Sequence, residues 1–256
     1  MRSLWVFGDS FSEDIYLLPT DTDRILYSKK FLKKRSYKIW SELVASKLGY
    51  QYKNYAALNS LNKKFIKSGN TNDDCLNALS YFSNKFEKDD VVFIGITDTS
   101  RYKLPPLKSG YKDNPIHPQI ITNDSFIDKF IDTTSLYKLC ILRGERIDYY
   151  MEEFMIRLNP IIKLSELIGF HVFIWSWVDE INKIIFQNDF LHKKNWVFLN
   201  DEKFKNYNFS YYNFLKSFGI PTSIFEATNG EIIDYHQSEE SHILHSEFLI
   251  NILNQK

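Results

Sequence analysis

Short apolar runs separated by stretches of helical periodicity are the feature that most restricts how this chain can fold. Residues 3–7, 91–94 and 171–175 are apolar and too short for helices, which predicts strands buried on both faces of a sheet. Helical patterns occupy 37–48 and 72–87 between these runs. Strands that alternate with helices in this way predict a parallel sheet covered by helices on both faces.

Capping residues define two of these helices more closely. Gly49 follows the first helical pattern and is a predicted C-cap. Asn72 or Asp73 is the predicted N-cap of the second pattern. The other predicted elements are strands around 51–56 and 222–225, helical structure over 126–168 and an amphipathic helix over about 239–254.

The sequence contains no linker or internal repeat, and its length of 256 residues is common for one α/β domain. We therefore predict one domain over 1–256. Four prolines and little periodicity between 99 and 124 indicate a long excursion from the core. This predicts a loop or cap insertion around 99–165, and insertions of this length tend to be functional.

Charge and cysteine content exclude several classes of protein. Lys and Arg total 32 and Asp and Glu total 32, which argues against a nucleic-acid partner. Cys75 and Cys140 are far apart and lack CxxC spacing, so reduced thiols are expected, with no disulfide framework and no zinc site. No metal or other cofactor is expected. The sequence has no apolar leader and no run near the roughly 18 apolar residues of a membrane span. A cytoplasmic or otherwise soluble protein is therefore expected.

A candidate nucleophile follows the first predicted strand. Gly8, Asp9 and Ser10 come directly after residues 3–7, and loops at the carboxyl ends of parallel strands are where α/β proteins place their chemistry. The same tripeptide is also compatible with an ordinary turn. Ser12 is a less favoured nucleophile because it lies further from the strand end.

A candidate base lies near the other end of the chain. Nucleophilic serine chemistry needs an imidazole and a group that fixes its tautomer. Asp234 is two residues before His236, close enough to accept its Nδ1 hydrogen after a tight turn. The alternative is that this segment only begins the last helix. The elbow G-x-S-x-G is absent from the sequence, so a serine hydrolase here must use a scaffold other than the α/β-hydrolase fold.

Four blocks of sequence, in order along nearly the whole chain, make it resemble the SGNH (GDSL-type) hydrolases. The first block is the Phe-Gly-Asp-Ser-Phe-Ser run at 7–12, and the second begins at Asn54 after a Trp-x-x-Leu helix. The third is Gly-Ile-Thr-Asp at 95–98, and the fourth is Asp-Tyr-His-Gln-Ser at 234–238. The resemblance implies a flavodoxin-like three-layer α/β/α sandwich with a mostly parallel sheet.

The resemblance also implies a role for each matched residue. Ser10 is the expected nucleophile, His236 the general base and then acid, and Asp234 the partner that orients it. The expected oxyanion hole comprises the backbone N–H groups of Ser10 and Asn59 and the side chain of Thr97. Asn59 stands where the family has glycine, and Thr97 stands where it has asparagine. Loss of one oxyanion donor typically costs about 100- to 1000-fold in turnover.

Two further residues are candidates for substrate binding. Asp9 is expected to brace the nucleophile loop or contact the substrate. Arg101, three residues past Asp98, is suited to an anionic group on the substrate, with a surface salt bridge as the equal alternative. The expected activity is serine esterase activity on a small acyl ester, including an O-acetyl group on a saccharide. The alternatives are a weakened or inactive binding or structural protein with this fold, and an acyltransferase.

The sequence also predicts the surroundings of two tryptophans and two histidines. Trp175 and Trp177 share one face of their strand, and packing beneath a covering helix is favoured over a substrate-facing aromatic wall. His242 and His245 lie three residues apart on the last helix, with no cysteine or HExxH spacing to support a metal site. A structural role is expected for His242 and a solvated side chain for His245.

Overall fold

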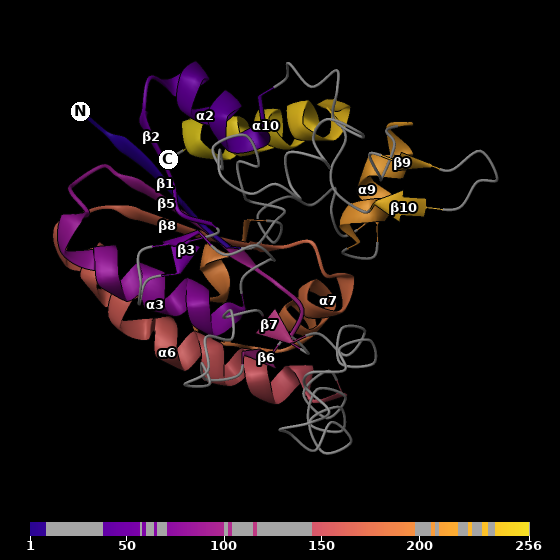
Figure 1. Cartoon of the computed structure of the whole chain (residues 1–256), viewed down its shortest axis with the longest axis horizontal. Helices are drawn as coiled ribbons and strands as arrows, with labels where there is room; N and C mark the ends of the chain where they lie inside the picture. Colours follow the sequence, from indigo (N-terminus) through magenta and orange to yellow (C-terminus); the bar gives the residue numbers. More distant parts are fainter. Residues whose placement is uncertain are drawn as a thin grey trace.

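Four parallel strands form the central sheet of the protein in a computed structural model of the chain (Figure 1). They are β1 (Ser3–Phe7), β2 (Gln51–Asn54), β5 (Val91–Ile96) and β8 (His171–Ser176). Their order across the sheet is β2-β1-β5-β8, and each neighbouring pair is parallel. This corresponds to the 2-1-3-4 order of flavodoxin-like sheets, so the predicted α/β class is confirmed.

The structure describes thirteen segments of the chain: residues 1–8, 38–56, 58–59, 64–65, 71–99, 102–103, 115–116, 145–197, 206–207, 210–219, 225–226, 232–234 and 239–255. Within these segments, no helix combines the length and the apolar character that a bilayer-spanning segment requires.

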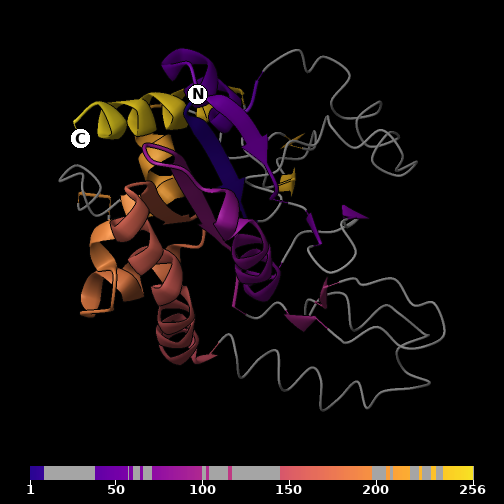
Figure 2. The ribbon, with the colours of Figure 1, turned by 90° about the vertical axis from the view of Figure 1, so that its left-hand side faces the viewer.

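Helices cover both faces of the sheet (Figures 1 and 2). On one face lie α2 (Trp40–Leu48) and α10 (Glu239–Asn254), which run side by side. On the other face lie α3 (Asn72–Phe82), α6 (Ile147–Ile168) and α7 (Asp179–Gln187). The described part of the chain is therefore a three-layer α/β/α arrangement.

Short elements surround this core. They are the antiparallel pairs β3 (Leu58–Asn59) with β4 (Lys64–Phe65), β6 (Tyr102–Lys103) with β7 (Pro115–Ile116), and β9 (Phe225–Glu226) with β10 (Ile232–Asp234), together with helix α9 (Tyr211–Ser217) and 3₁₀ turns at Ser83–Lys85 and Lys193–Asn195.

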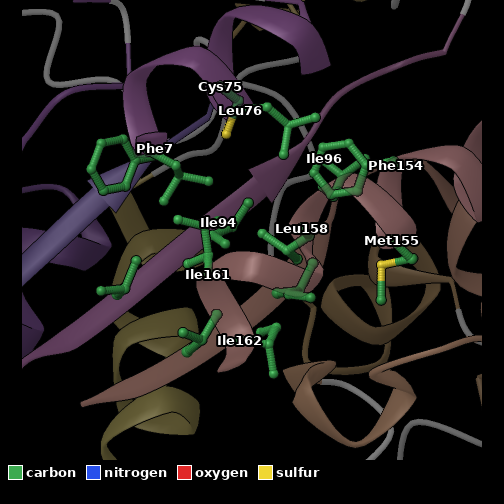
Figure 3. Close-up of a cluster of buried hydrophobic side chains, with 14 of the residues drawn as sticks. Phe7, Cys75, Leu76, Ile94, Ile96, Phe154, Met155, Leu158, Ile161 and Ile162 are labelled. Atoms are coloured by element: carbon green, nitrogen blue, oxygen red, sulfur yellow. The ribbon is translucent and has the colours of Figure 1, made fainter. Parts of the chain in front are cut away.

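Alternation of side chains along the strands divides the core into two layers. Val92, Ile94 and Ile96 of β5 face α3 and α6, whereas Val91 and Phe93 face α2 and α10. Figure 3 shows Ile94 and Ile96 among apolar side chains of α3 and α6. All five β5 side chains are at most 1% exposed, so the strand is held firmly between the two helical layers.

A buried carboxylate fixes the amino end of β1. The Oδ1 atom of Asp90 accepts a hydrogen bond from the Ser3 backbone N–H at 2.7 Å. Its Oδ2 atom accepts from the Trp5 indole at 2.8 Å and from the Glu87 backbone N–H at 3.1 Å. Asp90 is 1% exposed, and hydrogen bonds to a charged acceptor are among the strongest in proteins.

Several predicted boundaries are confirmed. The first strand, at residues 3–7, and the last helix have the predicted bounds. Gly49 caps α2 with a φ of 70°, the left-handed conformation that glycine adopts without a Cβ penalty. β5 runs past Gly95 to Ile96, two residues further than the predicted strand. Of the weak strand predicted at 222–225, only Phe225 lies among the described residues, as the first residue of β9.

The predicted N-cap of α3 is wrong by one residue. Thr71 caps the helix, because its Oγ1 accepts from the Asp74 backbone N–H at 3.2 Å while the Asp74 carboxylate accepts from the Thr71 N–H at 3.2 Å. Such a reciprocal capping box satisfies two N–H groups at once. The side chains of Asn72 and Asp73 are therefore available for contacts outside the helix.

Helix α6 overlaps the end of the insertion predicted around 99–165. Its buried residues pack against the sheet, so this helix belongs to the α/β core. Ahead of it, Tyr102 of β6 pairs with Ile116 of β7. Residues 100–101, 104–114 and 117–144 of the predicted insertion lie outside the described part of the chain.

The layer formed by α2 and α10 confirms one prediction and corrects another. Trp175 packs edge-on against Trp40 at a ring separation of 5.8 Å, and Trp177 joins the same layer, as predicted for packing beneath a covering helix. The prediction that His245 is solvated is wrong. His245 is 1% exposed and stacks on Trp40 at 4.9 Å, because it shares the buried stripe of α10 with Leu249. Burial lowers the pKa of the His245 imidazole to about 3, so this side chain is neutral at pH 7.

Candidate active site at the carboxyl edge of the sheet

The carboxyl end of β1 lies where the strand order of the sheet reverses. Phe7 is paired with Ile94, so Gly8 leaves the sheet beside Gly95 of β5. From β1 the chain passes to β2 on one side, and the later strands β5 and β8 lie on the other. Open α/β sheets bind ligands at such a switch point, outside the carboxyl ends of the strands. The Gly-Asp-Ser block thus begins at the position where this fold places ligands.

The backbone at Gly8 needs glycine, and the strand before it is held rigidly. Gly8 has a φ of 151°, a positive value that residues with a Cβ rarely adopt. The Phe7 ring stacks against Tyr55 at 5.9 Å, and Tyr55 stacks against Phe82 of α3 at 4.1 Å. This aromatic packing against α3 therefore holds the end of β1 in place, directly before the candidate site.

Thr97 follows β5 at the same edge, and the first residue of α3 binds its backbone. The Asn72 Oδ1 accepts from the Thr97 backbone N–H at 2.9 Å, and the Asn72 Nδ2 donates to the Thr97 carbonyl at 3.0 Å. Thr97 is 1% exposed, and its Oγ1 has no hydrogen-bond partner among the described residues. Because Asn72 occupies the backbone N–H, the hydroxyl is the remaining donor of Thr97.

Helices α2 and α10, on the face of the sheet away from α3, also begin at the carboxyl edge. α2 leads directly into the parallel strand β2, so it ends at the amino edge of the sheet and begins towards the carboxyl edge. The His242 Nδ1 in the first turn of α10 accepts from the Trp40 backbone N–H, the first of α2, at 3.2 Å. α10 therefore starts beside α2, and His242, which is 4% exposed, has the predicted structural role.

The turn from β8 to α7 lies at the same carboxyl edge, on the side of β5 away from β1. The Ser176 Oγ donates to the Ile96 carbonyl at 2.9 Å and accepts from the Val178 backbone N–H at 3.1 Å. The Asn182 Nδ2 of α7 donates to the Ser176 carbonyl at 2.9 Å. These bonds tie the end of β8 to the end of β5, next to Thr97.

The second sequence block has a structural role at its first residue. The Asn54 Oδ1 accepts from the Ala56 backbone N–H at 2.9 Å, which forms an Asx turn at the end of β2. Further along, Asn59 lies in β3 opposite Lys64 of β4. The predicted oxyanion residue Asn59 is thus described only as backbone in a short antiparallel pair.

The other predicted site residues are placed only in part. Asp234 is the last residue of β10, and its side chain is outside the description. Asp9, Ser10, Arg101 and His236 lie outside the described residues. The structure therefore places Gly8 and Thr97 at the same edge of the sheet, and the pairing of nucleophile and base stays a prediction.

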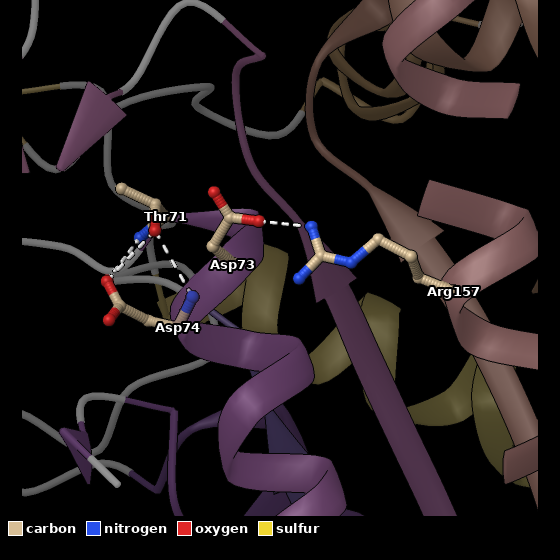
Figure 4. Close-up of polar contacts among 4 residues, drawn as sticks. All are labelled: Thr71, Asp73, Asp74 and Arg157. Atoms are coloured by element: carbon tan, nitrogen blue, oxygen red, sulfur yellow. Dashed lines mark hydrogen bonds and ion pairs between the residues drawn. The ribbon is translucent and has the colours of Figure 1, made fainter. Parts of the chain in front are cut away.

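Sequence reasoning missed a polar pocket of about 140 Å³ beside Thr97. Its charged members are Asp73 of α3 and Glu153 and Arg157 of α6. Figure 4 shows the Asp73 carboxylate pointing across to the Arg157 guanidinium, with which it forms an ion pair. The two residues are 84 positions apart, so no local pattern could have paired them. The other lining residues are Asn72, Thr99, Tyr150 and Phe154.

The described residues contain no group of three or more histidine, cysteine or acidic side chains that could hold a metal ion. Fold and site together define an α/β protein with a parallel sheet and a candidate site at its switch point. Comparisons with models of protein families, with curated proteins and with solved structures find no match. The function must therefore be argued from the residues and their geometry.

Proposed function

We propose that this protein is a serine esterase that hydrolyses a small acyl ester through an acyl-serine intermediate. The observation that carries the proposal is the position of Gly8, two residues before Ser10, at the carboxyl end of a central strand. A serine two residues after this strand end is suited to nucleophilic attack on a ligand bound at the switch point. The resemblance of the four sequence blocks to SGNH hydrolases supports the same role.

In the proposed reaction, the Ser10 hydroxyl attacks the ester carbonyl while His236 accepts its proton. The tetrahedral intermediate collapses, and the alcohol leaves with the proton from His236. A water molecule, deprotonated by His236, then attacks the acyl-serine and releases the acid and free Ser10. Asp234 holds the imidazole in the required tautomer throughout. The start of α10 at the carboxyl edge supports this, because the chain enters α10 three residues after His236.

Thr97 is the proposed side-chain donor to the oxyanion. Its hydroxyl has no partner among the described residues, whereas its backbone N–H is bound to Asn72. A buried hydroxyl without a partner is costly to the fold, and a developing oxyanion would accept its hydrogen bond. The backbone N–H groups of Ser10 and Asn59 are the two other proposed donors.

The test is a comparison of wild type with Ser10→Ala, using p-nitrophenyl acetate turnover and labelling by a fluorophosphonate. We expect labelling of wild type on Ser10, located by peptide mass spectrometry, and loss of both signals in the variant. Ser12→Ala is the matched control and should keep both. Labelling that persists in Ser10→Ala, or hydrolysis that does not depend on this serine, would overturn the proposal.

A second candidate function is a non-catalytic binding protein with the same fold. Burial of Thr97 favours it, because a residue that is 1% exposed contacts a ligand only if its covering side chains move. The same experiment separates the candidates. Absence of fluorophosphonate labelling and of Ser10-dependent turnover in correctly folded protein is the result expected of a non-catalytic protein.

A further inference from the structure

We infer that the polar pocket of about 140 Å³ between α3 and α6 binds a neutral polyhydroxyl group, which forms the alcohol part of the substrate. That the bound group is part of a substrate rests on the proposed esterase function. That the pocket binds a polyhydroxyl group rests on the pocket residues alone. The two can therefore fail separately in experiment.

The pocket adjoins the candidate site through a shared residue. Asn72 lines the pocket and also binds the backbone N–H and carbonyl of Thr97. Thr99, two residues after Thr97, lines it as well. A group held in the pocket is therefore next to the carboxyl end of β5, where the proposed oxyanion donor lies.

The charges of the pocket disfavour an anionic ligand. Arg157 is paired with Asp73, and their side chains are 42% and 43% exposed, so this pair is accessible to a ligand. Glu153 adds a second carboxylate one helical turn before Arg157. Because two carboxylates surround one guanidinium, a phosphate or carboxylate on the ligand would meet repulsion as well as attraction.

Hydroxyl groups match these side chains in both directions of hydrogen bonding. Carboxylates accept from a hydroxyl hydrogen, and a guanidinium with five N–H donors has donors left after one ion pair. The Asp73–Arg157 pair thus presents an acceptor and a donor side by side, as adjacent hydroxyls of a polyol require (Figure 4).

The remaining lining residues and the size of the pocket fit one ring. Tyr150 and Phe154 lie one turn apart on α6, and both line the pocket. Aromatic faces pack against the apolar C–H face of a sugar-sized ring. A volume of about 140 Å³ corresponds to roughly five water molecules at about 30 Å³ each, which is enough for a single six-membered ring but not for a long acyl chain.

The experiment compares mono-O-acetyl methyl hexosides with p-nitrophenyl acetate, which lacks hydroxyl groups. In Glu153→Gln, the ratio of kcat/KM for the hexoside ester to kcat/KM for p-nitrophenyl acetate should fall at least about tenfold, because a hydrogen bond to a charged group is weakened. Glu152→Gln is the matched control on the exposed face of α6 and should leave both values unchanged. An unchanged ratio in Glu153→Gln would overturn the inference.

Binding to Ser10→Ala is measured in parallel, with methyl hexosides and with tetramethylammonium followed by NMR titration. Saturable hexoside binding that Glu153→Gln weakens supports the pocket even if wild type has no esterase activity, in which case only the proposed function fails. Ser10-dependent hydrolysis without hexoside binding overturns the pocket assignment and leaves the esterase. Binding of tetramethylammonium but not of hexosides also overturns it.

Discussion

The side chain of Asn72 binds both the N–H and the carbonyl of Thr97, a residue 25 positions further along the chain. An amide is suited to this because it offers one acceptor and one donor in the same plane. The first residue of α3 is thereby fixed to the end of β5. The contact fixes the backbone of Thr97, and Asn72 also lines the polar pocket.

Replacement of Asn72 by alanine should therefore destabilise the protein. Both Thr97 backbone groups lose their partner, which typically costs about 1–3 kcal/mol for a buried group. Urea unfolding of Asn72→Ala measures the change. Asn84→Ala, at an exposed position in the 3₁₀ turn Ser83–Lys85, should show almost none. Equal stabilities for the two variants would contradict the role of Asn72.

Thr97→Val separates the catalytic role of this residue from its structural role. Valine has nearly the same shape and removes a buried hydroxyl that has no partner among the described residues, so the free energy of unfolding should be unchanged or higher. Turnover of p-nitrophenyl acetate should fall about 100-fold or more, as for other oxyanion donors. Thr97→Ser keeps the hydroxyl and should retain most of the turnover. Full activity in Thr97→Val would remove Thr97 from the oxyanion hole.

Asp90→Asn should lower the free energy of unfolding by at least about 2 kcal/mol. In the variant, the amide N–H donor of asparagine faces N–H groups that bind a carboxylate oxygen in the wild type. The substitution also removes a buried charge that accepts three hydrogen bonds. Asp89→Asn is the control, because Asp89 has a φ of 65° and asparagine tolerates this conformation. Thermal and urea unfolding should show a loss only for Asp90→Asn.

The pH dependence of stability should carry a contribution from His245. Burial lowers the pKa of His245 to about 3, whereas the pKa of a histidine in an unfolded chain is about 6.5. Between these values the unfolded chain binds a proton that the folded chain does not. The contribution of His245 is thus complete above pH ~6.5 and is lost as the pH falls, by up to about 1.4 kcal/mol per unit.

The measurement is urea unfolding of wild type and His245→Phe at pH 7 and pH 5. Wild type should lose about 2 kcal/mol more than the variant between these pH values. His171→Gln, at the exposed start of β8, should behave as wild type. Parallel pH profiles for wild type and His245→Phe would show that the imidazole is accessible to protons in the folded state.

The strands and most helices followed from local patterns. The run is apolar at every position from Leu4 to Phe7 because both faces of β1 are covered, and the sequence carries this information directly. Two predictions failed for different reasons. His245 was expected to be solvated, but the distant helix α2 covers the stripe it occupies. Asn72 or Asp73 was expected to cap α3, but the neighbouring Thr71 forms the capping box with Asp74.

The residues that follow the strand ends could be predicted from the sequence, whereas the residues that line the polar pocket could not. Gly8 and Thr97 follow apolar runs, so their shared edge follows from the parallel order of the strands. The pairing of Asp73 with Arg157 depends on how α3 and α6 pack, which no local spacing specifies. The oxyanion assignment of Asn59 and the triad of Ser10, Asp234 and His236 remain predictions.

The capping of α3 by Thr71 has a consequence for how the protein assembles. Because Thr71 and Asp74 complete the helix start locally, the first turn can form before the rest of the chain has packed. The side chains of Asn72 and Asp73 then find their partners only after β5 and α6 are in place. Three successive residues thus bind partners in three different places, so the start of one helix connects its own first turn, the end of β5 and α6.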